Sequence, residues 1–188
     1  MNLRTRLLLA TLAAAASSAQ AVEFKQFQPA KSALTFVFKQ MNVPVDGQFK
    51  SFRSTLAFDP AKPAAAKAEF EIDMASIDAG SKDANDEVAG KLWFNTKAFP
   101  TAKFVATSVK PLGANRYEVA GKMTIKGKTL DLTTPVTVRQ EGNSASFEGS
   151  LILKRADYAI GEGMWADFGT VANEVQIKFR LVATAAAK

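Results

Sequence analysis

The sequence contains no cysteine and no histidine. Without cysteine the domain has no disulfide bonds, so packing alone must hold it together. Without histidine it lacks the commonest general base, the usual partner of Ser and Cys nucleophiles, and the most frequent metal ligand. The hydrolase patterns S-x-x-K and G-x-S-x-G are also absent. These absences argue against an enzyme, and we expect no catalytic residues.

The sequence also lacks a strong excess of charge of one sign. A formal net charge of +6 on 188 residues is not the dense basic stripe of a nucleic-acid-binding protein, so we expect no nucleic-acid partner. Lys122, Lys126 and Lys128 surround one expected hairpin, which indicates either a solvated tip or a patch for transient contact with a membrane surface. The acidic residues of segment 78–87 lack the D-x-D-x-D-G spacing of a calcium loop. We therefore expect no metal and no cofactor.

The sequence has no apolar run of the roughly 20 residues that span a bilayer. Its N-terminal run, 7–16, is short, follows Arg4 and Arg6, and is followed by Ala19-Gln20-Ala21. A basic start, a short apolar stretch and an A-x-A site are typical of a secretory leader. We expect residues 1–21 to be removed after Ala21, leaving a single domain, 22–188, that is periplasmic or secreted.

The rest of the chain shows mainly a period of two. Val175, Ile177 and Phe179 alternate with charged or polar residues, which predicts a strand with one buried and one wet face. Short turns such as Asp46-Gly47 and Lys126-Gly127 connect such segments and favour antiparallel pairing. The expected strands are 34–38, 49–58, 67–73, 104–109, 117–125, 130–138, 145–153 and 174–181.

One segment, 83–99, departs from this pattern. It begins with polar residues and then places Val88, Leu92 and Trp93 at helical offsets. We expect a short helical insertion here, with Asp83 as its N-cap and Asp86 three residues later. The predicted fold class is therefore all-β: eight antiparallel strands in a closed barrel or a two-sheet sandwich, with this insertion.

An eight-stranded barrel has an interior that its own side chains can fill, or that can hold one slim ligand. The inward-facing positions here are bulky, with 14 Phe in the sequence against 2 Tyr. Composition alone leaves both a filled and a hollow interior open.

Several segments, taken together and in order, resemble the YceI-like family of exported, polyisoprenoid-binding, lipocalin-like proteins. They are Ser32-Ala33-Leu34-Thr35-Phe36, Val45-Asp46-Gly47-Gln48-Phe49, Phe58-Asp59-Pro60, Ile72-Asp73-Met74-Ala75-Ser76-Ile77-Asp78, Trp93-Phe94, Phe99-Pro100-Thr101-Ala102-Lys103-Phe104, Gly121-Lys122-Met123-Thr124-Ile125-Lys126-Gly127 and Leu153-Lys154-Arg155-Ala156-Asp157-Tyr158-Ala159-Ile160-Gly161. The resemblance implies an eight-stranded antiparallel lipocalin-like barrel that holds an isoprenoid lipid or quinone, with no metal and no catalytic residues. It does not fix the oligomeric state and leaves a dimer open.

One departure concerns the head group of such a lipid. Many members of the family carry an Asp-x-His-Leu segment before the aromatic pair, whereas this chain has Asp86-Glu87-Val88-Ala89-Gly90-Lys91-Leu92. A polar contact made by that histidine cannot be transferred to this chain.

The predicted function is to carry or store a long isoprenoid lipid inside the barrel. The predicted tunnel lining is Phe36, Phe38, Phe49, Phe58, Phe70, Trp93, Phe94, Phe104, Met123, Phe147, Trp165, Ile177 and Phe179. Arg155 and Asp157 share the inward parity of their strand, so they form either a polar rim for the head group or a structural ion pair. The alternatives are a filled barrel with a structural or stress-related role in the envelope, and an enzyme that acts on a bound isoprenoid through carboxylates or through Tyr117 and Tyr158.

Overall fold

The structure is a computed structural model in which residues 22–185 are described. The predicted leader, 1–21, lies outside the described residues. The strands are β1 (Phe24–Phe27), β2 (Ala33–Gln40), β3 (Val43–Phe49), β4 (Phe52–Ala57), β5 (Lys67–Asp73), β6 (Ile77–Asp78), β7 (Thr101–Gly113), β8 (Arg116–Ile125), β9 (Lys128–Glu141), β10 (Ser144–Lys154) and β11 (Glu174–Ala185). The α-helix is α1 (Lys82–Ala89), and the 3₁₀ turns are η1 (Pro29–Lys31), η2 (Pro63–Ala65), η3 (Met74–Ser76), η4 (Arg155–Tyr158) and η5 (Gly163–Trp165).

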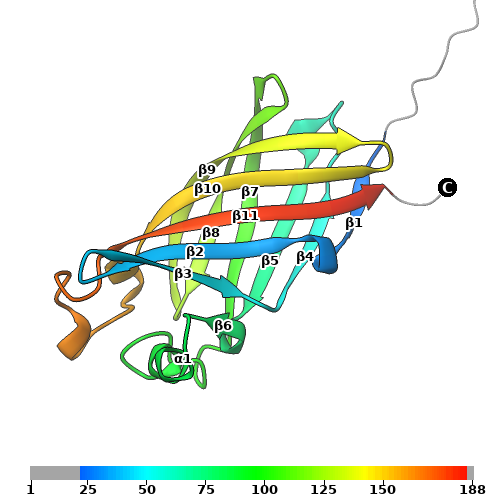
Figure 1. Ribbon diagram of the computed structural model, residues 1–188. Coiled ribbons are helices and arrows are strands. Elements are labelled where there is room, and N and C mark those ends of the chain that lie inside the picture. The colour runs from blue at the N-terminus through cyan, green and yellow to red at the C-terminus, as the bar shows by residue number, and fades with distance from the viewer. Residues whose placement is uncertain (1–21, 186–188) are drawn as a thin grey trace, which may run out of the picture.

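The strands form one curled antiparallel sheet, which confirms the predicted all-β class (Figure 1). Its order is β4-β5-β7-β8-β9-β10-β11-β2-β3-β6. β1 joins the two sides of the curl near the termini: it pairs with β11, and Phe24 exchanges two backbone hydrogen bonds with Phe58, of 2.9 and 3.1 Å. At the opposite end lie α1 and the loop between β10 and β11, residues 155–173, hereafter the 155–173 loop (Figure 1).

The prediction of eight strands was wrong in number, since the described residues form eleven. The expected strand 49–58 is in fact the end of β3 followed by β4, with a corner at Lys50 and Ser51. Ser76 holds this corner: its carbonyl accepts from the Lys50 N–H at 3.1 Å, and its hydroxyl accepts from the Ser51 N–H at 3.0 Å. The two short strands β1 and β6 contain too few residues to show a period.

The expected turn at Asp46-Gly47 was also wrong, because both residues lie inside β3. The chain turns instead at Met41 and Asn42, whose φ angles are +49° and +64°. Two successive positive φ angles define the tight hairpin turn that suits antiparallel strands. Met is an unusual residue in that conformation, so the sequence pattern did not mark this turn.

The predicted short helical insertion is present, and its helix is α1. α1 ends at Ala89, and the chain then makes successive turns as far as Ala98. The N-cap is Ser81, whose hydroxyl accepts from the Ala84 N–H at 3.1 Å. Asp83 is the acidic residue of the first helical turn and not the cap. No helix within residues 22–185 is long and apolar enough to cross a bilayer.

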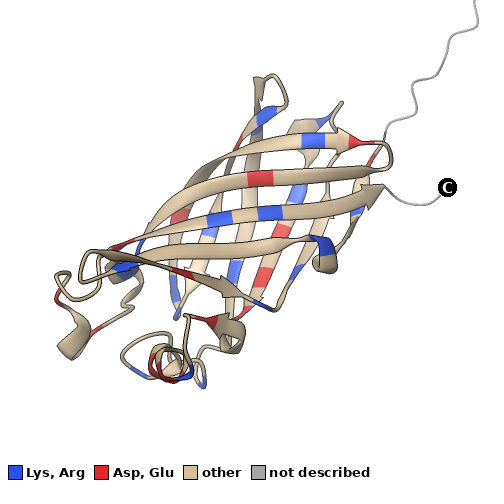
Figure 2. Cartoon of the chain, viewed as in Figure 1, with Lys and Arg blue, Asp and Glu red and all other residues tan. Residues whose placement is uncertain are grey.

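Charged residues recur along the strands and on α1 (Figure 2). Several form pairs across neighbouring strands, such as Lys122 with Asp131 at 2.8 Å and Arg180 with Glu148 at 3.3 Å. All of these side chains are at least partly exposed. The apolar residues of the alternating pattern therefore face the interior of the curl, where they form two clusters.

The first cluster lies near the termini. Phe58 makes edge-to-face contacts with Tyr117 and Phe147, with ring centres 5.3 and 5.2 Å apart. The second cluster lies near α1 and includes Trp93, Tyr158 and Ile160. Residues of both clusters line the cavity inside the curl.

Candidate functional site: an apolar cavity inside the curled sheet

The interior of the sheet contains a cavity of about 630 Å³. This volume is within the range of about 300–1,000 Å³ that is common for small-molecule sites. The cavity is lined almost wholly by apolar side chains from β2 to β11, with additions from α1 and the 155–173 loop.

The structure brings all thirteen residues of the predicted tunnel lining to this cavity. They are Phe36, Phe38, Phe49, Phe58, Phe70, Trp93, Phe94, Phe104, Met123, Phe147, Trp165, Ile177 and Phe179. That they contact a ligand stays a prediction. The strand residues among them reach the cavity because alternate side chains of a strand share one face.

Further apolar residues line the cavity that the prediction did not name. They include Phe52, Leu56, Val109, Tyr117, Val136, Val138, Leu151 and Leu153. Phe52 shares the parity of Phe58 but is predicted from the sequence to lie near a loop, whereas it begins β4. Leu151 and Leu153 share the parity of Phe147, so the period of two was sufficient to find them.

Three glycines in the wall of the cavity leave room for aromatic rings of the neighbouring strands. A Cβ atom built on Gly47, Gly121 or Gly149 would lie 2.2–2.4 Å from a ring carbon of Phe36, Phe104 or Phe179, respectively. Each ring therefore occupies the space above a glycine of the neighbouring strand. A larger residue at any of these positions would push the ring toward the cavity, so the Gly–Phe pairs help to preserve its volume.

The cavity opens at the end of the sheet where α1 lies. Of its lining residues within the described chain, only four are exposed: Gln40, Ser81, Asp83 and Glu87. Gln40 ends β2, and the other three come from the start and the body of α1. We call the opening bordered by these four residues the mouth.

The two tryptophans lie beside the mouth. Their ring centres are 5.5 Å apart, and the Trp165 Nε1–H donates to Glu87 Oε1 at 2.7 Å. This hydrogen bond connects the 155–173 loop to α1, although the two segments are far apart in the sequence. Two backbone hydrogen bonds, from the Gly161 and Glu162 N–H groups to the Leu92 carbonyl, hold the loop against the segment that follows α1 as well.

Arg155 has a different role from either predicted one. Its side chain is 2 % exposed, and its five N–H groups donate to the carbonyl oxygens of Ile160, Gly161, Trp165, Val171 and Ala172 at 2.7–3.2 Å. Every donor of the guanidinium is used. Arg155 thus holds the 155–173 loop in its folded path.

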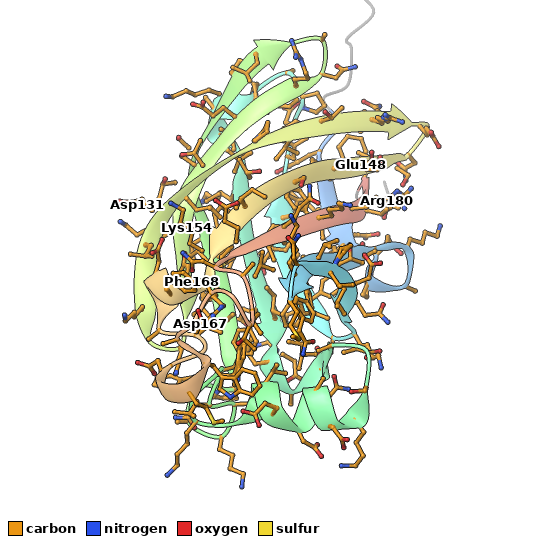
Figure 3. All side chains as sticks on the ribbon, turned by 60° about the vertical axis from the view of Figure 1, so that its left-hand side comes forward. Asp131, Glu148, Lys154, Asp167, Phe168 and Arg180 are labelled. Carbon is orange, nitrogen blue, oxygen red and sulfur yellow. The ribbon has the colours of Figure 1, made fainter. Side chains whose placement is uncertain are left out.

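The predicted pairing of Arg155 with Asp157 was wrong. Asp157 lies in η4, is exposed, and does not line the cavity. The strand ends at Lys154, so the parity argument that placed both side chains inward does not extend to Asp157. Burial lowers the pKa of Arg155 from its usual value, and the negative charge of Asp167 opposes that shift. Figure 3 shows Asp167 and Phe168 on this loop.

Two of the three lysines of the β8–β9 hairpin are engaged in pairs. Lys126 Nζ donates to the Ala159 carbonyl at 2.6 Å and to Glu162 at 2.9 Å, and its side chain is only 8 % exposed. Lys122 pairs with Asp131. The hairpin is therefore a support for the 155–173 loop, and these contacts do not favour a membrane-docking patch of free lysines. Within residues 22–185 no three acidic side chains lie close enough together to hold a metal ion.

With this geometry in place, comparison with known proteins decides the family. The model of the YceI-like domain matches residues 26–183. The chain belongs to the YceI-like family. Among its relatives are the UPF0312 protein of Pseudomonas fluorescens, which is 32% identical over 71% of each chain, and the UPF0312 protein of Photorhabdus laumondii, which is 31% identical over 86% of each chain.

Solved structures agree with the fold. BcnA of Burkholderia cenocepacia is 51% identical, with a TM-score of 0.82 over 85% of this chain and 100% of BcnA. A polyisoprenoid-binding domain of Saccharophagus degradans, implicated in plant cell wall breakdown, has a TM-score of 0.66 over 89% of this chain and 100% of that domain, at 17% identity. At 17% identity, the similarity between that domain and this chain shows only that the two share a fold.

Proposed function

We propose that this protein binds a long isoprenoid lipid, either a polyprenyl chain or an isoprenoid quinone, in its cavity and carries or stores it outside the cytoplasm. The observation that carries the proposal is the apolar cavity of about 630 Å³ that opens at the mouth. Transfer of apolar groups from water contributes about 0.8 kcal/mol per CH₂. Two isoprene units, with ten carbons, therefore contribute on the order of 8 kcal/mol before the costs of ordering.

Two further lines of support come from outside the cavity. The Saccharophagus degradans domain, which has the same fold, is a polyisoprenoid-binding domain. The basic, apolar and A-x-A pattern of residues 1–21 supports export to the periplasm or the medium. A filled barrel with only a structural role is disfavoured, because the space inside the sheet is open.

The proposal includes no catalytic step. The enzymatic alternative relied on carboxylates or on tyrosines. Asp157 is exposed outside the cavity, and the two carboxylates that line the cavity, Asp83 and Glu87, lie at its solvent-exposed mouth. Burial and the charge of Asp157 raise the pKa of Tyr158, so its hydroxyl stays protonated at neutral pH and is a poor base.

The test uses two adjacent residues of β10. Leu151 lines the cavity, whereas Ile152 is 53% exposed on the outer face. Leu151→Trp should fill part of the cavity, and Ile152→Trp should leave it unchanged. Organic extracts of the purified proteins are analysed by mass spectrometry. We expect an isoprenoid lipid with the wild type and Ile152→Trp, and little or none with Leu151→Trp. Repeated wild-type preparations without lipid, together with no uptake of added isoprenoid, would refute the function.

A further inference from the structure

The charges at the mouth bear on which head group the lipid carries. Of the described residues that line the cavity, only Asp83, Glu87 and Arg155 carry a formal charge. The other polar groups of the lining are the side chains of Gln40, Ser81 and Thr134, the hydroxyl of Tyr117 and the indole N–H groups of the two tryptophans. A head group that remains at the mouth while the tail fills the cavity meets these side chains.

The single cation is not available to a ligand. All five N–H groups of Arg155 donate to backbone carbonyls. Its guanidinium also lies over the rings of Trp93 and Phe168, at 5.4 and 5.1 Å from their centres. A phosphate would have to replace several of these contacts to bind it, and the carbonyls of the 155–173 loop would then lose their donors.

The two carboxylates, unlike Arg155, are available to a ligand. Asp83 and Glu87 are four residues apart on α1, so they project from one face of the helix. Both line the cavity and both are exposed. Glu87 accepts one hydrogen bond, from Trp165, which leaves capacity for further donors, since a carboxylate has about four lone-pair sites.

The positive end of α1 does not reverse this charge. Helix N-termini favour anions, but the Ser81 hydroxyl already accepts from the Ala84 N–H, and Asp83 places a carboxylate in the first turn. The ligand's head group therefore meets fixed negative charge that no free cation of the described lining offsets, and the one unpartnered donor nearby, the indole N–H of Trp93, is neutral.

We infer that the mouth selects against lipids with an anionic head, such as a phosphate, and takes a neutral or cationic head group. Asp83 and Glu87 are the residues that make this selection. The inference rests on the proposed function, since it concerns the head group of the lipid in the same cavity.

Three probes with the same C20 isoprenoid tail test it: the alcohol, the amine and the monophosphate. Both tryptophans of the chain line the cavity, so their fluorescence can report binding to the full chain without its leader. We expect the amine to bind most tightly, then the alcohol, with the monophosphate at least about tenfold weaker than the alcohol at low salt.

Two double variants separate charge from size. Asp83→Asn with Glu87→Gln removes both carboxylates, and the Gln oxygen can still accept from Trp165. Asp86→Asn with Asp131→Asn changes the net charge equally, but neither Asp86 nor Asp131 lines the cavity. We expect the first variant to lose most of the discrimination among the three probes, and the second to keep it.

The results also distinguish this inference from the proposed function. If the monophosphate binds as tightly as the alcohol, or if discrimination persists after Asp83 and Glu87 are neutralised, the selection is not made by these carboxylates and the inference is wrong, while lipid binding stands. If no probe binds to the wild type, the proposed function fails as well.

Discussion

The guanidinium of Arg155 lies over the ring of Trp93, with its central carbon 5.4 Å from the ring centre. The same guanidinium binds five carbonyls of the 155–173 loop. One side chain thus connects the loop to the aromatic residue that follows α1. The loop and the segment that follows α1 share this support, and both lie beside the mouth.

We expect Arg155→Ala to destabilise the protein by at least about 3 kcal/mol, because it leaves several buried carbonyls without donors. Arg155→Lys should recover only part of the loss, since an ammonium has three donors and no planar fork. Chemical denaturation measures both variants. Arg139→Ala, at an exposed position on β9, is the control and should change stability by less than about 0.5 kcal/mol. An Arg155→Ala variant as stable as this control would contradict the structural role.

The two ends of the cavity should respond differently to the loss of an aromatic ring. Phe147 is buried and packs edge-to-face on Phe58 at 5.2 Å, so Phe147→Ala should cost about 3–5 kcal/mol. Phe38 is half-buried beside the cavity, with Phe36 at 6.2 Å, so Phe38→Ala should cost clearly less in the lipid-free protein. Denaturant unfolding of both variants without lipid measures the difference, and equal losses would indicate a uniformly packed interior.

Most of what the sequence predicts about the fold comes from the alternation of apolar and polar residues along the strands. It identified the long strands and the antiparallel pairing, and it placed Phe147, Ile177 and Phe179 on the inner face. It failed at the corner after Phe49 and at the Met41-Asn42 turn. Both are set by contacts between distant segments, such as those of Ser76 with Lys50 and Ser51, which local pattern does not contain.

The candidate site was predictable in its apolar part but not in its polar part. Parity and the family resemblance located the lining. The role of Arg155 depends on how residues 155–173 fold back over the strand end, and no local pattern specifies that path. The sequence predicts Asp83 only as a helix N-cap and indicates no role for Glu87 beyond the acidic segment 78–87. Their spacing of four residues puts them on one face of α1, but only the fold shows that this face borders the cavity.

The close contact between Gly149 and the Phe179 ring predicts that a larger residue at position 149 lowers stability. A Cβ on Gly149 would lie 2.3 Å from a Phe179 ring carbon and 2.7 Å from the Pro135 carbonyl oxygen. The backbone oxygen cannot move as easily as a flexible side chain. Gly149→Ala should therefore destabilise the protein by about 1–3 kcal/mol and reduce lipid uptake. Ser150→Ala, at an exposed neighbouring position, is the control, and thermal unfolding with an uptake assay checks both effects.

The Lys126–Glu162 contact predicts a pH effect on the 155–173 loop. The hydrogen bond from Lys126 lowers the pKa of Glu162 below its ordinary value of 4.5. A carboxyl group with a lowered folded-state pKa stabilises the fold fully above its unfolded pKa and loses that contribution as the pH falls through the folded value. Glu162→Gln should therefore lower the Tm at pH 7, and the difference from the wild type should shrink as the pH falls below 4.5 and Glu162 becomes protonated. Glu141→Gln, exposed at the end of β9, serves as the control and should have little effect at either pH. A Tm difference for Glu162→Gln that persists unchanged in acid would show that Glu162 supports the loop through packing and not through its charge.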